Sequence, residues 1–188
     1  MKSVVIALTG LLVSVSVAFA QDDVKERSDA ARAAAMDFGG ALLAKLQEAM
    51  AAGGAVNALG VCNMAAPAIA AEKSAARNMS IRRTSLRLRQ PKNAPDAWEL
   101  AQLQRFEERK AAGENPTAIE AGEYVELNGK KVFRYMKAIP TGPVCLNCHG
   151  GALTPEVSAK LKELYPDDKA TGFKIGDLRG AFTVTLTP

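Results

Sequence analysis

The chain has 188 residues, of which 48% are hydrophobic, and its 24 basic and 20 acidic side chains give a net charge of +4. This charge is too small to indicate a chain that binds nucleic acid through phosphate contacts. Three cysteines are too few for a disulfide framework, and no low-complexity tract or repeat is present. The composition fits one domain long enough to bury a core.

Residues 1–20 have the pattern of a cleaved secretory signal. Lys2 supplies the positive start, residues 4–17 carry no charge, and Ala18-Phe19-Ala20 fits a cleavage site before Gln21. An uncleaved anchor is the alternative, but the apolar stretch is short for a bilayer span. We expect a signal peptide over residues 1–20, a single domain over residues 21–188 without an integral membrane segment, and a periplasmic mature protein.

The N-terminal part of that domain is predicted to be helical. Residues 24–50 are rich in alanine and leucine and precede Gly53-Gly54, which predicts a long helix interrupted at Gly39-Gly40. A second helix is expected over residues 55–77, with a kink or a break near Pro67.

A strand and a third helix are predicted next. Residues 81–88 partly alternate between polar and apolar side chains, which favours a strand, and the prolines that follow indicate a turn. Asp96 is expected to cap a helix that continues to Lys110.

The C-terminal half is predicted to contain the rest of an antiparallel sheet. Residues 124–127 and 131–139 flank Asn128-Gly129, a dipeptide that accepts the positive φ angles of a two-residue hairpin turn. Thr154 is expected to cap a short helix, and residues 180–187 alternate as a final strand. Helices followed by an antiparallel sheet predict an α+β fold.

The most specific motif is Cys145-Leu146-Asn147-Cys148-His149, a CxxCH sequence. Two thiols at this spacing can bond to the two vinyl groups of one haem, while the adjacent histidine ligates its iron. His149 is the only histidine of the chain. The motif therefore predicts one covalently attached haem c (heme c).

Two other uses of a CxxC sequence fit the chain less well. A structural zinc site takes four ligands as a rule, and after the motif only Cys62 remains as a soft donor. A thioredoxin-like dithiol opens a helix, whereas Gly150-Gly151 follow this motif and favour a break.

The sixth ligand of the iron must come from a residue other than histidine. Cys62 is the preferred candidate, because the other two cysteines are used for attachment and leave it without a disulfide partner. A small buried hydrophobe is the alternative role for Cys62. Met64 is the main rival ligand, and the remaining methionines are expected in the core or at the surface.

A basic cluster, Arg82, Arg83, Arg87 and Arg89 with Thr84 and Ser85, offers groups for the two haem propionates. Guanidinium groups form charge-assisted, bidentate bonds with carboxylates. A charged edge strand exposed to solvent is the alternative. We take Arg82, Arg83 and Ser85 as candidate cofactor-binding residues.

Several further segments accompany the CxxCH motif: Val61-Cys62, residues 65–70, residues 82–86, residues 91–99, residues 165–172 and residues 176–181. With these landmarks the mature chain resembles a family of single-haem c-type domains with a PAS-like fold, found as exported proteins and as sensing domains of bacterial receptors. The resemblance implies a PAS-like antiparallel sheet with N-terminal helices and one covalently bound haem. It also implies that His149 and Cys62 are the axial pair.

A haem held in this way suggests a low-potential cytochrome that transfers electrons to a protein partner still to be identified, because a thiolate ligand stabilises ferric iron. The alternative is a sensor of redox state or of a diatomic gas, in which NO or CO displaces Cys62 and a separate protein carries the signal. An enzyme such as a peroxidase is disfavoured, since the single histidine is already used as a ligand.

Overall fold

The computed structural model describes residues 12–186, and for residues 12–20 it describes the backbone alone. The expected signal segment, residues 1–20, thus lies outside the described side chains. The helices and strands are α1 (Leu12–Arg77), β1 (Met79–Thr84), the 3₁₀ turn η1 (Pro91–Asn93), α2 (Ala97–Ala111), β2 (Glu120–Leu127), β3 (Lys130–Pro140), the 3₁₀ turn η2 (Pro143–Cys145), α3 (Leu146–His149), α4 (Pro155–Leu164) and β4 (Leu178–Leu186).

The four strands form one antiparallel sheet in the order β1-β4-β3-β2. Val184 of β4 lies opposite Ile81 of β1 and Tyr135 of β3, so the last strand of the chain occupies the centre of the sheet. The predicted α+β fold is confirmed.

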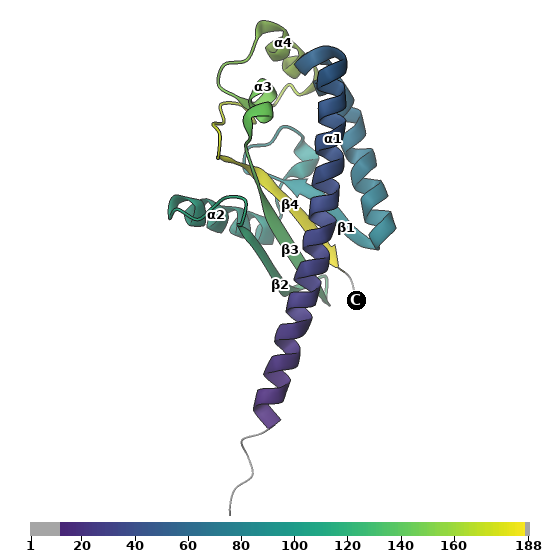
Figure 1. The fold of residues 1–188 in the computed structure, drawn as a ribbon, viewed down its shortest axis with the longest axis vertical. Coiled ribbons are helices and arrows are strands. Elements are labelled where there is room, and N and C mark those ends of the chain that lie inside the picture. The colour runs from purple at the N-terminus through teal and green to yellow at the C-terminus, as the bar shows by residue number, and fades with distance from the viewer. Residues whose placement is uncertain (1–11, 187–188) are drawn as a thin grey trace, which may run out of the picture.

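The long helix α1 consists of two arms that run antiparallel to each other (Figure 1). The break falls at Gly53 and Gly54, as predicted, and Gly54 has a φ of 67°, which glycine adopts without strain. The predicted interruption at Gly39-Gly40 is wrong, because the first arm is helical there. A Cβ atom at Gly39 would lie 2.8 Å from the Phe182 ring, so this glycine serves a close helix–sheet approach.

Each face of the sheet is covered by a helix (Figure 1). The first arm buries Ala31, Ala34, Ala35 and Phe38, a spacing that keeps these residues on one side of a helix. They pack against one face of the sheet, on the side chains of Ile81, Phe133, Tyr135, Val184 and Leu186. On the opposite face, α2 packs Leu103 and Phe106 against Ile119, Met136, Ala138, Leu178 and Ala181.

Most of the helix caps and turns predicted from short sequence patterns are present in the structure. Asp96 caps α2 in a capping box with Glu99, Thr154 caps α4, and Asn128 and Gly129 have the expected positive φ angles. The first strand is shorter than predicted and ends at Thr84. Beside this end, Gly180 of β4 lies against the backbone of β1, and a Cβ there would lie 2.3 Å from the carbonyl oxygen of Thr84.

By length and composition alone, the helical stretch Gln21–Arg77 could cross a membrane, since its most apolar window has a mean hydropathy of 1.4. Only 17% of that window is buried in the structure. The expectation of no later spanning segment therefore stays a prediction.

A polar cluster around Glu120 joins the first arm of α1 to the sheet. Nε of Arg32 donates to both carboxylate oxygens of Glu120, at 3.0 and 2.9 Å, and the Tyr135 hydroxyl donates to the same carboxylate at 2.7 Å. Chiefly because of the Arg32 hydrogen bonds, the pKa of Glu120 falls from 4.5 to about 2.

We expect Glu120→Gln to lower the free energy of unfolding by about 1–2 kcal/mol at pH 7, because charge-assisted bonds to a partly buried carboxylate are lost. Since the folded-state pKa is depressed, this contribution is complete above the unfolded value of 4.5 and fades as the pH falls towards 2. Urea unfolding at pH 7 and pH 3 measures the difference. Glu126→Gln, at an exposed position of the same strand, is the control; an equal loss in both variants would contradict the assignment.

Candidate functional site

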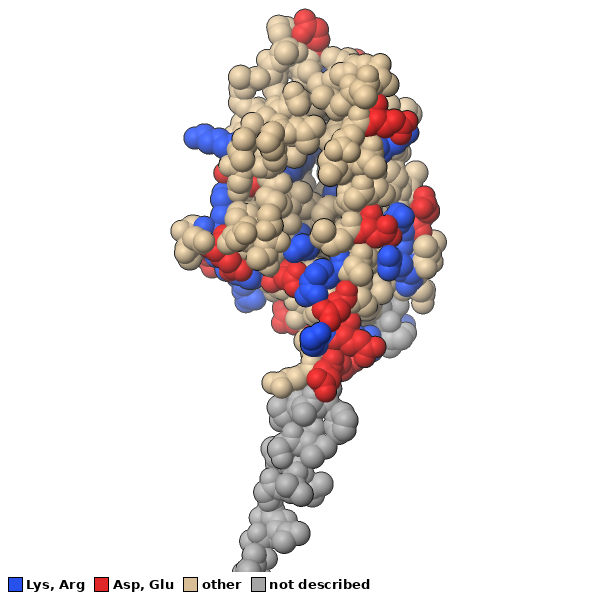
Figure 2. All heavy atoms as spheres, viewed as in Figure 1, with Lys and Arg blue, Asp and Glu red and all other residues tan. Residues whose placement is uncertain are grey.

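A cavity of about 270 Å³ lies where the two arms of α1 approach the motif helix and one end of the sheet. In Figure 2 a hollow opens between uncharged side chains in the upper part of the molecule, with basic side chains visible inside it. Its walls are mostly apolar, and they include Leu42 and Leu46 of the first arm, Leu59 of the second arm, and Phe182 of β4. All three cysteines and the single histidine line this cavity.

The CxxCH motif forms η2 and the single turn α3. In a helical turn, side chains three or four positions apart lie on the same face, so Cys145, Cys148 and His149 face the cavity together. Gly150 ends the turn, and a Cβ atom there would lie 2.7 Å from the Leu146 carbonyl oxygen. The predicted helix break after the motif is confirmed.

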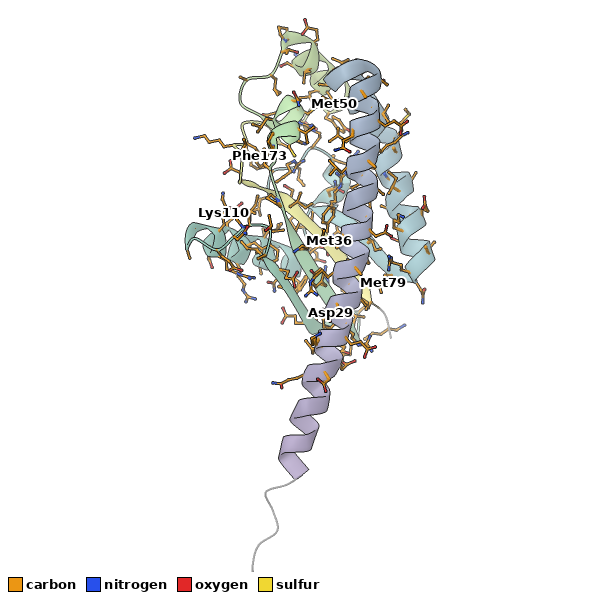
Figure 3. The ribbon with its side chains drawn as sticks, in the orientation of Figure 1. Asp29, Met36, Met50, Met79, Lys110 and Phe173 are labelled. Carbon is orange, nitrogen blue, oxygen red and sulfur yellow. The ribbon has the colours of Figure 1, made fainter. Side chains whose placement is uncertain are left out.

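The imidazole of His149 is held in one orientation by the chain around residue 170. Its Nδ1 lies 2.6 Å from the carbonyl oxygen of Ala170, and Phe173, labelled in Figure 3, meets the ring edge-on at a centroid distance of 6.1 Å. A carbonyl oxygen only accepts hydrogen bonds, so Nδ1 carries the proton and Nε2 keeps its lone pair. In this tautomer the lone pair of Nε2 can bind a metal.

The surroundings of His149 keep the imidazole neutral. Burial, followed by the charges of Arg179 and Arg89, lowers the pKa of His149 from 6.5 to about 2. Nε of Arg179 lies 3.2 Å from Nδ1 and 3.4 Å from Nε2, and Nη1 of Arg89 lies 3.5 Å from Nε2. A neutral imidazole is the form that ligates iron.

Arg89 ties the motif to the segment that follows α4. Its guanidinium lies 2.9 Å from the Asp168 carboxylate, and it donates to the carbonyl oxygens of Cys148 at 2.6 Å and Ala170 at 3.2 Å. The Arg89 and Asp168 side chains are only 10% and 8% exposed. This buried pair therefore fixes both the motif helix and the carbonyl group that orients His149.

Cys62 reaches the cavity from the second arm of α1. Burial raises the pKa of its thiol, and the nearby Arg83 acts in the opposite direction. Met64, the rival ligand, is 74% exposed and does not line the cavity. Met36, Met50 and Met79, labelled in Figure 3, are likewise absent from the lining, as is Met136, which is buried under α2.

Not all of the predicted cofactor residues lie at the cavity. Arg83 and Ser85 line the cavity, but Arg82 does not. Neighbouring residues of a strand point to opposite faces, and Arg82 pairs with the fully buried Glu99 on the α2 side. The prediction for Arg82 is corrected accordingly.

Sequence reasoning missed Arg179 as a cavity residue. Arg179 lies in β4, and its Nη1 donates to the Ser85 hydroxyl at 3.0 Å and to the Arg87 carbonyl oxygen at 3.3 Å. It falls inside the landmark segment 176–181, but no local pattern distinguished it from other arginines.

The groups at the cavity fit a haem better than a zinc ion. Within residues 21–186, no three His, Cys, Asp or Glu side chains are close enough together to hold a metal ion by themselves. The lining combines apolar walls, three thiols, a neutral imidazole and three arginines, with no carboxylate among the described lining residues. Such a set suits a flat apolar ligand that carries negative charge and a metal.

Comparison with known proteins gives two matches. The model of the family described as Tll0287-like matches residues 14–187. Among solved structures, the cyanobacterial haem protein Tll0287 is similar, with a TM-score of 0.54 and 29% sequence identity over 65% of this chain and 70% of that chain. No curated protein matches significantly. These matches support a single-haem domain family, while the PAS-like fold stays a prediction.

Arg89→Gln should lower the free energy of unfolding by about 3–5 kcal/mol, because it leaves the carboxylate of Asp168 buried without its cation. Urea unfolding of the wild type and the variant measures this loss. Arg105→Gln removes the same charge from an exposed position of α2 and should cost less than about 0.5 kcal/mol. Equal unfolding midpoints for Arg89→Gln and the wild type would show that the pair does not hold the site together.

Proposed function

We propose that this chain, a member of the Tll0287-like family, is an exported mono-haem c-type cytochrome that transfers electrons at low potential. One observation carries the proposal: Cys62, which is far from the CxxCH motif in sequence, lines the same cavity as Cys145, Cys148 and His149. The matched protein of known structure is a haem protein, which supports haem as the ligand of this cavity.

In this proposal Cys145 and Cys148 attach the cofactor. Each thiol adds its S–H bond across one vinyl double bond to form a thioether, so no electrons are gained or lost. Cys145 ends η2 and Cys148 lies on α3, three positions later, so the two side chains share a face and both line the cavity. When bound, the haem supplies an iron that alternates between ferric and ferrous states.

His149 and Cys62 are the proposed axial ligands. The Ala170 carbonyl holds Nδ1 of His149 protonated and directs the other nitrogen to the iron. Cys62 comes from a different helix, and in contact with ferric iron its thiol would lose a proton, since the thiolate is the ligating form. An anionic ligand favours ferric iron and therefore a low potential.

A sensor of redox state or of NO or CO is the second candidate function. One observation favours it: Cys62 lies on the second arm of α1, which is joined to the first arm through the break at Gly53 and Gly54. Displacement of Cys62 from the iron would release this arm, and a separate protein would have to read the change. We propose no enzymatic role, because the described cavity walls offer no carboxylate for acid–base chemistry.

The proposed location is the periplasm, after removal of residues 1–20. The signal pattern at the N-terminus and the attachment motif are mutually consistent, because both belong to exported proteins. No role in binding nucleic acid is proposed, given the small net charge.

Covalent attachment has a direct test. The protein exported in a host with cytochrome c maturation factors should have the intact mass of residues 21–188 plus one haem, and acidified acetone should leave the haem on the protein. Cys145→Ala and Cys148→Ala should each leave a single thioether or none. Haem that passes from the wild type into the organic phase would contradict attachment, and a retained N-terminus would contradict cleavage.

Axial ligation is tested by two substitutions on the same helical arm. Cys62→Ala should convert ferric iron from low spin to high spin in electron paramagnetic resonance spectra and raise the reduction potential, since the anionic ligand is lost. Met64→Ala is the matched control and should change neither quantity, because this side chain points into solvent. The opposite result would identify methionine as the ligand.

A further inference from the structure

The cavity contains positive charge that the described residues do not neutralise. Arg83, Arg89 and Arg179 line it, and no aspartate or glutamate lies among the lining residues. Arg89 is compensated by Asp168 at 2.9 Å. The other two guanidinium groups make no ion pair with any acidic side chain in the described part of the chain.

Arg83 is the more isolated of the two. Burial lowers its pKa, with Cys62 and Tyr165 the nearest groups that act in the opposite direction. A half-buried charge without an ion-pair partner is unfavourable, and a negatively charged ligand would supply the missing anion.

Arg179 is held in place by neutral groups. Its Nη1 donates to the Ser85 hydroxyl and the Arg87 carbonyl oxygen, and its Nε lies beside the His149 ring. None of its hydrogen bonds to the described residues uses Nη2, which leaves that nitrogen for a ligand. Burial, followed by the charges of Arg89 and Arg83, lowers the pKa of Arg179 to about 10.

We propose that Arg83 and Arg179 form a two-point subsite for a dicarboxylate, each binding one of the two propionates of the haem. This assignment rests on the proposed function, and it matches two uncompensated guanidinium groups to the two carboxylates of one otherwise apolar ligand. Ser85 is a positioning residue that acts through Arg179. Arg82 takes no part, because its charge is used by Glu99 on the other side of the sheet.

The test uses the exported holoprotein, with Arg83→Gln and Arg179→Gln as variants and Arg105→Gln as the charge-matched control on exposed α2. Each cavity variant should shift one propionate bending band in the resonance Raman spectrum. Each should also lower the equilibrium constant for reduction about three- to tenfold, because an unneutralised propionate favours ferric iron. The control should change neither. Unshifted propionate bands in both cavity variants would overturn the assignment.

Further variants at Arg83, Arg179 and Ser85 keep the test decisive. If a glutamine variant does not accumulate, Arg83→Lys or Arg179→Lys should keep the wild-type reduction equilibrium while still shifting the band, since lysine retains charge but not the planar fork. Ser85→Ala should shift only the band that Arg179→Gln shifts, and Ser85→Thr should restore it. A Ser85→Ala effect on the other band would contradict the positioning role.

Failure of the proposed function would give a different experimental result from failure of the two-point subsite. A wild-type protein exported without covalent haem contradicts attachment but leaves the subsite testable with free haemin and its dimethyl ester as probes. Binding of haemin at least tenfold tighter than the ester, with the difference lost in Arg83→Gln and Arg179→Gln, supports the subsite. Equal affinities for the two probes overturn it.

Discussion

The buried ion pair between Arg89 and Asp168 is the interaction on which the site depends. The same guanidinium also binds the carbonyl oxygens of Cys148 and Ala170, so one side chain joins the motif helix to the segment beyond α4. The Ala170 carbonyl in turn sets the tautomer of His149. The placement of the motif helix and the orientation of the imidazole thus rest on a single network. A partly satisfied network of this kind would be less stable than an apolar contact.

The sheet keeps two polar systems apart. On the α2 side, Glu99 is fully buried and satisfied by Arg82, Arg134 and Thr183. On the other side, Arg83 faces the cavity without an acidic partner. Successive side chains of a β-strand point to opposite faces of the sheet, so Arg82 and Arg83 lie on opposite sides. One arginine then stabilises the fold while its neighbour remains available for a ligand.

The two proposed ligands come from distant parts of the chain. His149 belongs to a short turn clamped by the segment around residue 170, whereas Cys62 lies on the returning arm of α1. The first arm packs closely on the sheet, and Gly39 leaves room there for the ring of Phe182. In an electron carrier both ligands stay bound in the two oxidation states; in a sensor the Cys62 side is the one that would be released. The same architecture therefore accommodates either function, and the strength of the Cys62 bond decides between them.

Sequence alone determined the features that depend on a few neighbouring residues: the caps at Asp96 and Thr154, the turn at Asn128-Gly129, the helix break at Gly53-Gly54 and the grouping of Cys145, Cys148 and His149. Only the tertiary structure separated Arg82 from Arg83, ended β1 at Thr84 and brought Arg179 beside Ser85, a residue 94 positions away. A capping box or a tight turn carries its hydrogen-bonding partners within its own sequence. The partner of a cavity arginine is chosen by strand register and by chain packing from distant segments, and no local pattern encodes it.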